Sequence, residues 1–383
     1  MTKYAKLGNL GEIFIGLTYK PENVSSEGTI VLRSSNIQDG VLAFDDVVRV
    51  NCPVPKNLIV QSNDILMCSR NGSAKLVGKC TLLPEMSEGM TFGAFMTIIR
   101  TPYNGYLRYF FDSSAFRNQI KGSATTTINQ ITRKMLDEIQ VPIFDSYTQE
   151  RVSKNFEKVS ALIALRKEQL AKLDQLVKSR FIELFGDPLD NDKGWQKLLI
   201  TEVCHAIFGG GTPSKSHPEY FTGSIPWVSP KDMKSSVISD SIDHITEDAI
   251  AHSTTNLVPA NSVLMVIRSG ILKHTLPVAI NSVPVTINQD MKAFVPNEAV
   301  KTAFLMHYFK AIENDVLSGV RGVTADNIDF KAFQKRTIIV PPLELQEQFA
   351  AFVELTDKSK LAIQQSLDKL ELLKKALMQE YFG

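Results

Sequence analysis

Residues 208–215, with the sequence FGGGTPSK, carry several groups that bind phosphate oxygens in proteins. Backbone N–H groups of successive glycines, short hydroxyls and a lysine can together cradle an anion. The candidate ligands are Gly210, Gly211, Thr212, Ser214 and Lys215. The segment is not a Walker A loop, because GxxxxGK[ST] is absent. A DNA-backbone contact and a flexible β-turn both remain open for it. The matching place earlier in the chain is residues 15–20, where Thr18 and Lys20 are the candidates.

Basic and polar side chains also follow matched strand-like runs in the two halves of the chain. Arg70 and Arg268 each stand just past such a run, beside a turn, where a guanidinium is well placed to contact a guanine edge or a phosphate. Pairing with a local carboxylate is the alternative. The further candidates at matched positions are Asn71 with Ser269, Arg33 and Ser34 with Ser229 and Lys231, and Lys121 with Arg321.

Known catalytic and metal-binding patterns are missing. The sequence has no [DN]PP[YF] tetrapeptide of an adenine methyltransferase, no glycine loop for S-adenosylmethionine and no nuclease triad. The six histidines lack metal-helix spacing, and the four cysteines are far apart, which predicts reduced thiols without a metal. The pattern therefore favours binding over catalysis, with no cofactor.

These candidates belong to a long tandem repeat. From Gln149-Glu150 to Phe185-Gly186, the chain repeats about 197 residues later, from Gln346-Glu347 to Phe382-Gly383, without a gap. Each copy is preceded by Val-Pro and by an α+β-type pattern of short strand-like runs with one helix, over 105–119 in the first copy. We therefore predict an α+β protein with two pseudo-twofold-related domains, 1–145 and 188–342, separated by long helical segments, 146–187 and 343–383.

Both helical segments carry apolar residues every seven positions and contain no internal proline, which is typical of a coiled coil. We predict that they pair with each other in antiparallel orientation; the alternative is that each packs only on its own domain. The predicted seam consists of Phe156, Ile163, Leu170, Leu173, Val177, Leu184, Ile363, Leu367, Leu370 and Leu377.

Composition and charge bear on the partners and the location of such a protein. Of 383 residues, 44% are hydrophobic and 22% are charged, which is ordinary for a globular protein, and the net charge is only +1. Any affinity for DNA must therefore come from local patches, helped by a partner. No apolar run approaches the roughly 20 residues that span a bilayer, and the first residues do not resemble a signal peptide. We expect a cytoplasmic protein with no membrane association.

The arrangement resembles the specificity subunit of type I restriction–modification systems. The resemblance rests on the two Val-Pro…Gln-Glu entries into long helices, the Leu-Phe-Gly-Asp-Pro exit at 184–188, and the Trp195…GGGTPS…Ile-Pro-Trp-Val-Ser opening of the second half. It implies that each domain reads one half of a bipartite, asymmetric double-stranded DNA target. It also implies that two methyltransferase subunits dock on the helices, that restriction subunits join them, and that this chain itself is not catalytic. The first domain lacks the Gly-Gly-Thr-Pro signature, so that motif transfers only to residues 209–215.

Two other functions remain possible from the sequence. A stand-alone DNA-binding regulator with the same duplicated architecture would bind its site without partners. An enzyme with an unrecognised site would show turnover by itself.

Overall fold

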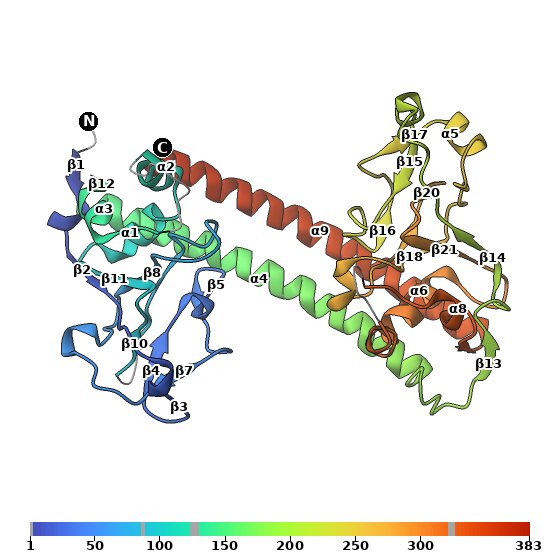
Figure 1. The fold of residues 1–383 in the computed structure, drawn as a ribbon, viewed down its shortest axis with the longest axis horizontal. Helices are drawn as coiled ribbons and strands as arrows, with labels where there is room; N and C mark the ends of the chain where they lie inside the picture. The colour runs from blue at the N-terminus through green and yellow to red at the C-terminus, as the bar shows by residue number, and fades with distance from the viewer. Residues whose placement is uncertain (1–2, 86–88, 123–129, 321–325) are drawn as a thin grey trace. The chain divides into compact units, whose positions relative to one another are not determined.

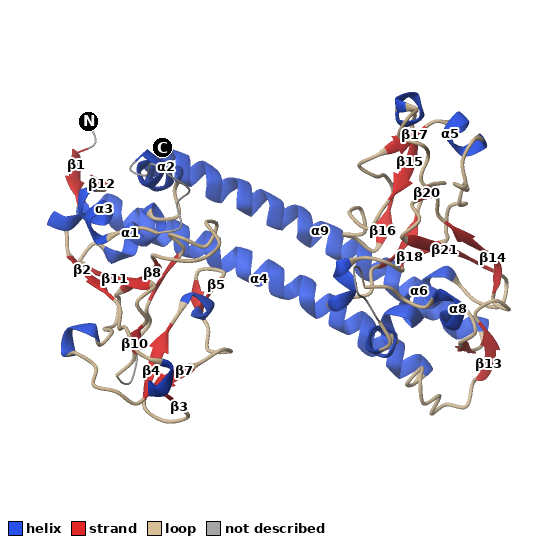
Figure 2. Cartoon of the chain, in the orientation of Figure 1, coloured by secondary structure: helices blue, strands red, loops and turns tan. Residues whose placement is uncertain are grey.

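The chain forms two compact units of mixed helix and strand (Figure 2). The computed structural model describes residues 3–85, 89–122, 130–320 and 326–383. Unit 1 comprises Met1–Lys167 with Gln365–Gly383, and unit 2 comprises Glu168–Gln364. Two 40-residue helices, α4 (Ser146–Phe185) and α9 (Leu343–Phe382), contribute one end to each unit (Figure 1). The α+β class predicted from the sequence is confirmed.

Unit 1 is built around an antiparallel sheet with the strand order β2-β11-β8-β9 and a second sheet with the order β10-β4-β7-β3. A separate antiparallel pair, β1-β12, joins the start of the domain to its end. The strands are β1 Lys3–Lys6, β2 Glu12–Ile15, β3 Val24–Ser25, β4 Thr29–Leu32, β5 Ile37–Gln38, β6 Val41–Leu42, β7 Val48–Val50, β8 Ile65–Cys68, β9 Cys80–Leu82, β10 Thr91–Phe92, β11 Met96–Arg100 and β12 Gln140–Ile143. The helices before α4 are α1 Asn104–Phe110, α2 Ser114–Gly122 and α3 Arg133–Glu138.

Unit 2 has the sheet orders β14-β21-β18-β19-β16 and β17-β15-β20, and the closing pair β13-β22. Its strands are β13 Gln196–Leu199, β14 Cys204–Gly209, β15 Ile225–Val228, β16 Val237–Ile238, β17 His244–Ile245, β18 Val263–Val266, β19 Val278–Asn281, β20 Thr286–Ile287, β21 Met291–Pro296 and β22 Thr337–Val340. Its helices before α9 are α5 Glu247–Ala251, α6 Thr302–Ala311, α7 Glu313–Ser318 and α8 Phe330–Phe333.

The two units share one strand plan. The order β2-β11-β8-β9 in unit 1 corresponds to β14-β21-β18-β19 in unit 2, and the parallel pair β4-β10 corresponds to the parallel pair β15-β20. The pair β1-β12 corresponds to β13-β22. The topology is therefore duplicated, as the repeat predicts. The twofold axis and the domain limits 1–145 and 188–342 stay predictions.

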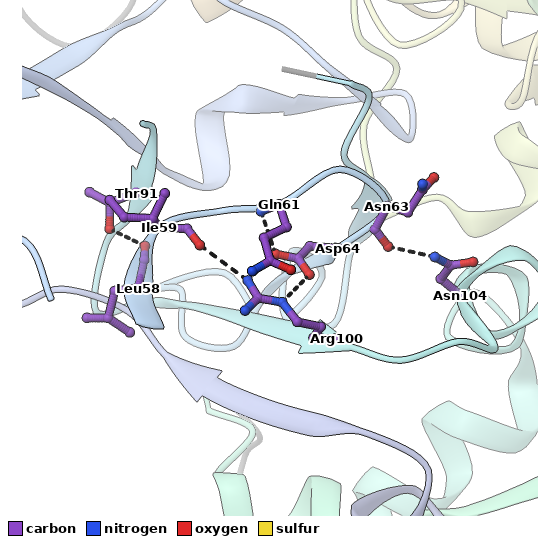
Figure 3. A network of polar contacts seen from close by, with 8 residues as sticks. All are labelled: Leu58, Ile59, Gln61, Asn63, Asp64, Thr91, Arg100 and Asn104. Carbon is purple, nitrogen blue, oxygen red and sulfur yellow. Dashed lines mark hydrogen bonds and ion pairs between the residues drawn. The ribbon is translucent and has the colours of Figure 1, made fainter. Parts of the chain in front are cut away.

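Matched asparagines fix the turn before the central strand of each unit. Asn63 and Asn261 both adopt positive φ, 66° and 63°, which asparagine tolerates better than most residues. The carbonyl of Asn63 accepts a hydrogen bond from Asn104 Nδ2 at 2.9 Å (Figure 3), and that of Asn261 accepts one from Thr302 Oγ1 at 3.1 Å. Each turn thus ties its central strand to the first helix that follows the sheet.

Unit 1 adds an ion pair beside this turn (Figure 3). Arg100 donates from Nε to Asp64 Oδ1 at 2.8 Å and from Nη2 to Oδ2 at 2.7 Å. The same carboxylate accepts a hydrogen bond from Gln61 N at 2.8 Å, and Asp64 is 1% exposed. In unit 2 the residue after the turn asparagine is Ser262, whose hydroxyl donates to Pro259 O. The ion pair is therefore particular to unit 1.

The single helix expected over 105–119 is wrong, because the segment forms two helices, α1 and α2. Ser113, which is buried, interrupts it: its hydroxyl donates to Phe110 O at 2.6 Å and accepts from Phe116 N at 3.2 Å. A serine that bonds both neighbouring backbone ends stops one helix and starts the next.

The long helices pack against each other in antiparallel orientation within each unit. In unit 1, Phe156 near the start of α4 stacks on Phe382 at the end of α9, with 6.1 Å between ring centroids. In unit 2, Phe181 near the end of α4 meets Phe349 near the start of α9, at 5.4 Å. The antiparallel pairing predicted from the sequence is therefore confirmed.

The same helix ends also enter the domain cores. Tyr109 of α1 stacks on Phe156 at 4.7 Å, and Phe304 of α6 stacks on Phe181 at 5.7 Å. The alternative, in which each helix packs only on its own domain, is therefore wrong: the helices pair, and the end of α4 packs on a helix of the second domain. Among the predicted seam residues, three are buried: Phe156, Val177 and Leu367. The others are half-buried: Ile163, Leu170, Leu173, Leu184, Ile363, Leu370 and Leu377. A continuous coiled-coil seam stays a prediction.

The repeated glutamine has a structural use in each copy. Gln346 is fully buried; its Nε2 donates to Pro341 O at 2.8 Å, and its Oε1 accepts from Lys301 N at 2.8 Å. Gln149 likewise donates from Nε2 to Phe144 O at 2.7 Å. Both glutamines satisfy backbone groups where a long helix begins, which accounts for their place in the repeat.

The described residues include no helix that is both long and apolar enough to cross a bilayer.

Candidate nucleic-acid interface

Four backbone segments of unit 1 meet at one place. They are the ends of β2, β4 and β8, and the turn between β10 and β11. Residues 93–95 form this turn, which we call the central turn of unit 1. Three hydrogen bonds join the segments: Leu17 N to Phe92 O (2.7 Å), Gly93 N to Leu32 O (3.0 Å) and Arg70 N to Phe95 O (3.0 Å). The candidate residues after three different strands are therefore brought together.

Unit 2 repeats this junction. Residues 288–290, between β20 and β21, form its central turn. The matching hydrogen bonds are Gly211 N to Ile287 O (3.0 Å), Asn288 N to Val228 O (2.9 Å) and Arg268 N to Asp290 O (3.2 Å). The chain thus places two copies of one loop arrangement at the ends of matched strands, a common location for binding residues.

The glycines of the FGGGTPSK segment serve close packing. A Cβ added to Gly210 would lie 1.8 Å from Asn288 O, and one added to Gly211 would lie 2.7 Å from Thr255 N. Gly211 is buried, its N–H is bonded to Ile287, and its carbonyl accepts from Trp227 Nε1 at 3.1 Å. The N–H of Gly211 is therefore not free for a phosphate. Gly16 has the same use in unit 1, because its added Cβ would lie 2.1 Å from Gly93 O.

The polar residues that follow the glycines lie at the surface. The exposed candidates here are Thr18 and Lys20 in unit 1 and Thr212, Ser214 and Lys215 in unit 2. Lys20 Nζ lies 3.4 Å from Glu22 Oε1, and the Thr212 hydroxyl donates to Gln289 of the central turn. These side chains, rather than the glycine backbone, are the groups that this segment offers to a ligand.

Arg70 is exposed and held by neutral partners. Its Nε and Nη2 both donate to Gln130 Oε1, the former at 3.0 Å, and its guanidinium carbon lies 5.5 Å from the centre of the Phe95 ring. Next to it, Asn71 Nδ2 donates to Ser34 Oγ at 3.1 Å. The positive charge of Arg70 therefore has no carboxylate among these partners.

Arg268, the matched residue, has a carboxylate instead. Its Nε and Nη2 donate to Asp290 Oδ1 at 2.6 and 2.5 Å, and Asn288 Nδ2 binds Asp290 Oδ2 at 3.2 Å. The carboxylate alternative that the sequence left open is thus present at Arg268. A fork contact to guanine through Nε and Nη2 would require this ion pair to open, whereas Nη1 is not part of it.

The other candidates fall into different settings. Arg33 is half-buried and pairs with Asp46 at 2.6 Å, and Lys231 is exposed, 3.4 Å from Asp243 Oδ2. Ser229 is 5% exposed and its hydroxyl donates to Asp232 Oδ2 at 2.8 Å, so it is poorly placed to touch DNA.

The remaining three candidates are Lys121, Ser269 and Arg321. Lys121 is exposed in the last turn of α2, and the Ser269 hydroxyl caps the short helix Gly270–Lys273. Arg321 lies outside the described residues.

One thiol, that of Cys68, lies close to the junction of unit 1. The Cys68 thiol donates to Arg70 O at 3.5 Å, and burial raises its pKa, which keeps it neutral. In the described ranges, no three or more His, Cys, Asp or Glu side chains are grouped to hold a metal ion.

Sequence reasoning missed three residues of the junctions: Phe95, Gln130 and Asp290. Aligning the two copies strand by strand would have placed Phe95 and Asp290 at one position. Each directly precedes the methionine that begins a matched strand, β11 in unit 1 and β21 in unit 2. No sequence signal marked Gln130, which reaches Arg70 across 60 residues of chain.

Comparison with known proteins agrees with this architecture. Residues 192–372 match the family model described as the type I restriction modification DNA specificity domain. The chain is 43% identical over 154 residues to the specificity subunit of the type I restriction enzyme EcoR124I/EcoR124II from Escherichia coli, a match that covers 39% of this chain and 37% of that protein. It is 28% identical over 170 residues to the MjaIX specificity subunit from Methanocaldococcus jannaschii, covering 43% and 38%. The chain thus spans less than half the length of these curated relatives.

Solved structures share the fold over almost the whole chain. The crystal structure of the S subunit of a type I restriction–modification system from M. genitalium has a TM-score of 0.61 at 13% identity and covers 100% of this chain and 96% of its own. A chain from a study of assembly and conformational transition of the type I R-M system has a TM-score of 0.54 at 19% identity, with 99% and 97% covered. Residues 192–372 are therefore similar in sequence to the type I restriction DNA specificity domain, and the chain shares the fold of solved type I S subunits.

Proposed function

We propose that this chain is the non-catalytic, DNA-recognising subunit of a type I restriction–modification complex. Domains 1–145 and 188–342 each read one half of a bipartite, asymmetric double-stranded DNA target. The long segments 146–187 and 343–383 separate the domains and dock two methyltransferase subunits, which restriction subunits join. The complex acts in the cytoplasm, and this chain requires no cofactor.

One observation carries the proposal: the same loop junction occurs twice, with unlike side chains. Arg70 is held by Gln130 beside Phe95, whereas Arg268 is held by Asp290. One backbone plan that presents two different sets of hydrogen-bonding groups is what reading two different half-sites requires.

The ion pairs of unit 2 support dependence on partners. Around its junction, Lys231 pairs with Asp243, Arg268 with Asp290 and Lys273 with Asp326. Phosphates must compete with these carboxylates, and the whole chain carries a net charge of only +1. Since nonspecific DNA affinity comes mainly from phosphate neutralisation, the chain alone should bind weakly. This favours the complex over a stand-alone regulator, which must hold its site unaided.

Exposed leucines on the long helices support methyltransferase docking. Leu162, Leu165 and Leu176 of α4 are 42%, 46% and 48% exposed, and Leu361 and Leu372 of α9 are 61% and 68% exposed. We expect a methyltransferase subunit docked on the helices to cover these apolar side chains.

The proposal is tested by co-expressing the chain with a type I methyltransferase subunit encoded in the same genome. We expect the two proteins to co-purify and the host genome to acquire N6-methyladenine at one bipartite sequence, detected by methylome sequencing. Omitting this chain should abolish that pattern. Tight binding of the chain alone to a promoter, without methylation, would favour the regulator instead. Turnover by the chain alone would favour an enzyme.

Removing either matched arginine should alter one half-site only. We expect Arg70→Ala to relax base preference in one half of the target and Arg268→Ala in the other, because each arginine lies in a separate junction. A lost base contact typically costs about 1–3 kcal/mol. The measurement is methylation of duplexes in which one half-site at a time is scrambled. If either variant weakened binding to all DNA alike, its arginine would contact the backbone only.

A further inference from the structure

The central turn presents a different side chain in each unit at one structural position. Phe95 and Asp290 occupy it: the carbonyl of each accepts a hydrogen bond from the backbone N–H of the matched arginine, Arg70 or Arg268. Each is followed by a buried methionine that begins the next strand. Because the backbone is the same, the two side chains point from equivalent places, and only their chemistry differs.

Phe95 presents an apolar ring to solvent. Its exposed fraction is 56%, whereas its neighbours Phe92 and Met96 are each 1% exposed. Folding therefore does not need the Phe95 ring, since the core is filled by the residues on either side of it. The ring is therefore available to pack against an apolar group of a ligand.

The ring is part of an ordered pair. The guanidinium of Arg70 lies 5.5 Å from the ring centre, and Gln130 holds two of its nitrogens, Nε and Nη2. The arrangement fixes a cation next to an apolar surface at the edge of one junction. In unit 2, Asp290 offers no apolar surface, and both of its carboxylate oxygens are already bonded, to Arg268 and Asn288.

We infer that Phe95 is a specificity-determining residue that contacts the 5-methyl group of a thymine in the half-site read by unit 1. This rests on the proposed function. In the major groove, the thymine methyl is the apolar group on the base edges, and phenylalanine is among the side chains that pack against it. Arg70, held alongside, contacts an acceptor on the adjacent base or phosphate. Asp290 has the different role of positioning Arg268.

The test removes single methyl groups from the DNA. Once the target is known, each thymine of both half-sites is replaced in turn by uracil, which lacks only the 5-methyl group, and binding by the complete methyltransferase complex is measured by competition. We expect one uracil to weaken binding about fourfold, the equivalent of about 0.8 kcal/mol for one buried methyl-sized group. With Phe95→Ala, thymine and uracil at that position should bind equally.

Two controls make the result specific. Asp290→Ala changes the same position of the other unit, so it should keep the fourfold preference for thymine. Thermal unfolding of Phe95→Ala should match the unchanged protein, because the ring is mostly exposed.

Four outcomes separate this inference from the proposed function. If no uracil matters in either half-site, or if Phe95→Ala keeps the preference for thymine, the inference is wrong while specific methylation still supports the function. If Phe95→Ala weakens all DNA equally, the ring contacts the DNA without reading it, which also overturns the inference. If the unchanged complex methylates no defined sequence, the function itself fails.

Discussion

Replacing Phe349 with alanine should strongly lower the stability of unit 2. The side chain is fully buried, and its ring lies 5.4 Å from Phe181, 5.5 Å from Phe185 and 5.2 Å from His307. Deleting a ring from such a site leaves a cavity and costs about 3–5 kcal/mol in free energy of unfolding. The loss should also loosen the start of α9 from the end of α4, because these aromatic contacts join them.

Urea unfolding monitored by circular dichroism measures this effect. Leu355→Ala is the matched control, since Leu355 lies on the same helix and is 66% exposed. It should change the free energy of unfolding by no more than about 0.5 kcal/mol, as is usual for surface substitutions. Equal effects of the two changes would show that Phe349 does not anchor the helix.

Replacing Asp64 with alanine should lower the stability of unit 1. The change removes both contacts of the Arg100 guanidinium with the carboxylate and leaves the N–H of Gln61 without its acceptor. Breaking a buried ion pair from one side typically costs 3–5 kcal/mol. The side chain of Arg100 is 23% exposed, so water solvates part of its unpaired charge. We therefore expect the free energy of unfolding to fall by about 3 kcal/mol.

Calorimetry can assign this loss to an ion pair. Glu22→Ala breaks the exposed pair with Lys20, whose side chains are 72% and 77% exposed, and should cost less than about 1 kcal/mol. An unfolding temperature of Asp64→Ala equal to that of Glu22→Ala would mean that the network in Figure 3 adds nothing beyond a surface pair.

The features that follow from local pattern could be predicted from the sequence. The long helices were evident because apolar residues recur with a helical period and no proline interrupts them. The duplicated strand order was evident because the two copies keep similar residues in similar order. The break between α1 and α2 was not, because serine within a helical pattern stops a helix only when its hydroxyl bonds the backbone, as that of Ser113 does.

The site was harder to predict because its properties depend on distant contacts. A glycine beside hydroxyls suggests an anion cradle, but Gly211 is closed off by Thr255 and Ile287, which sequence spacing does not reveal. Similarly, Arg268 meets Asp290 across 22 residues. Phe181, which packs into the core of unit 2, was not among the predicted seam residues. A seven-residue period selects the residues along one line of a helix, and Phe181 lies on the neighbouring line.

The composition of the core of unit 1 sets an order for folding during synthesis. Phe382 is 4% exposed and packs against Phe156, Phe110 and Phe144, all from the first half of the chain. At roughly 5–20 residues per second, the ribosome makes Phe382 roughly 10–50 s after Phe156. Until then, the aromatic side chains that Phe382 contacts are exposed on that side and can associate with other chains. Of the two units, the one that the ribosome begins earlier is therefore the one whose core is closed later.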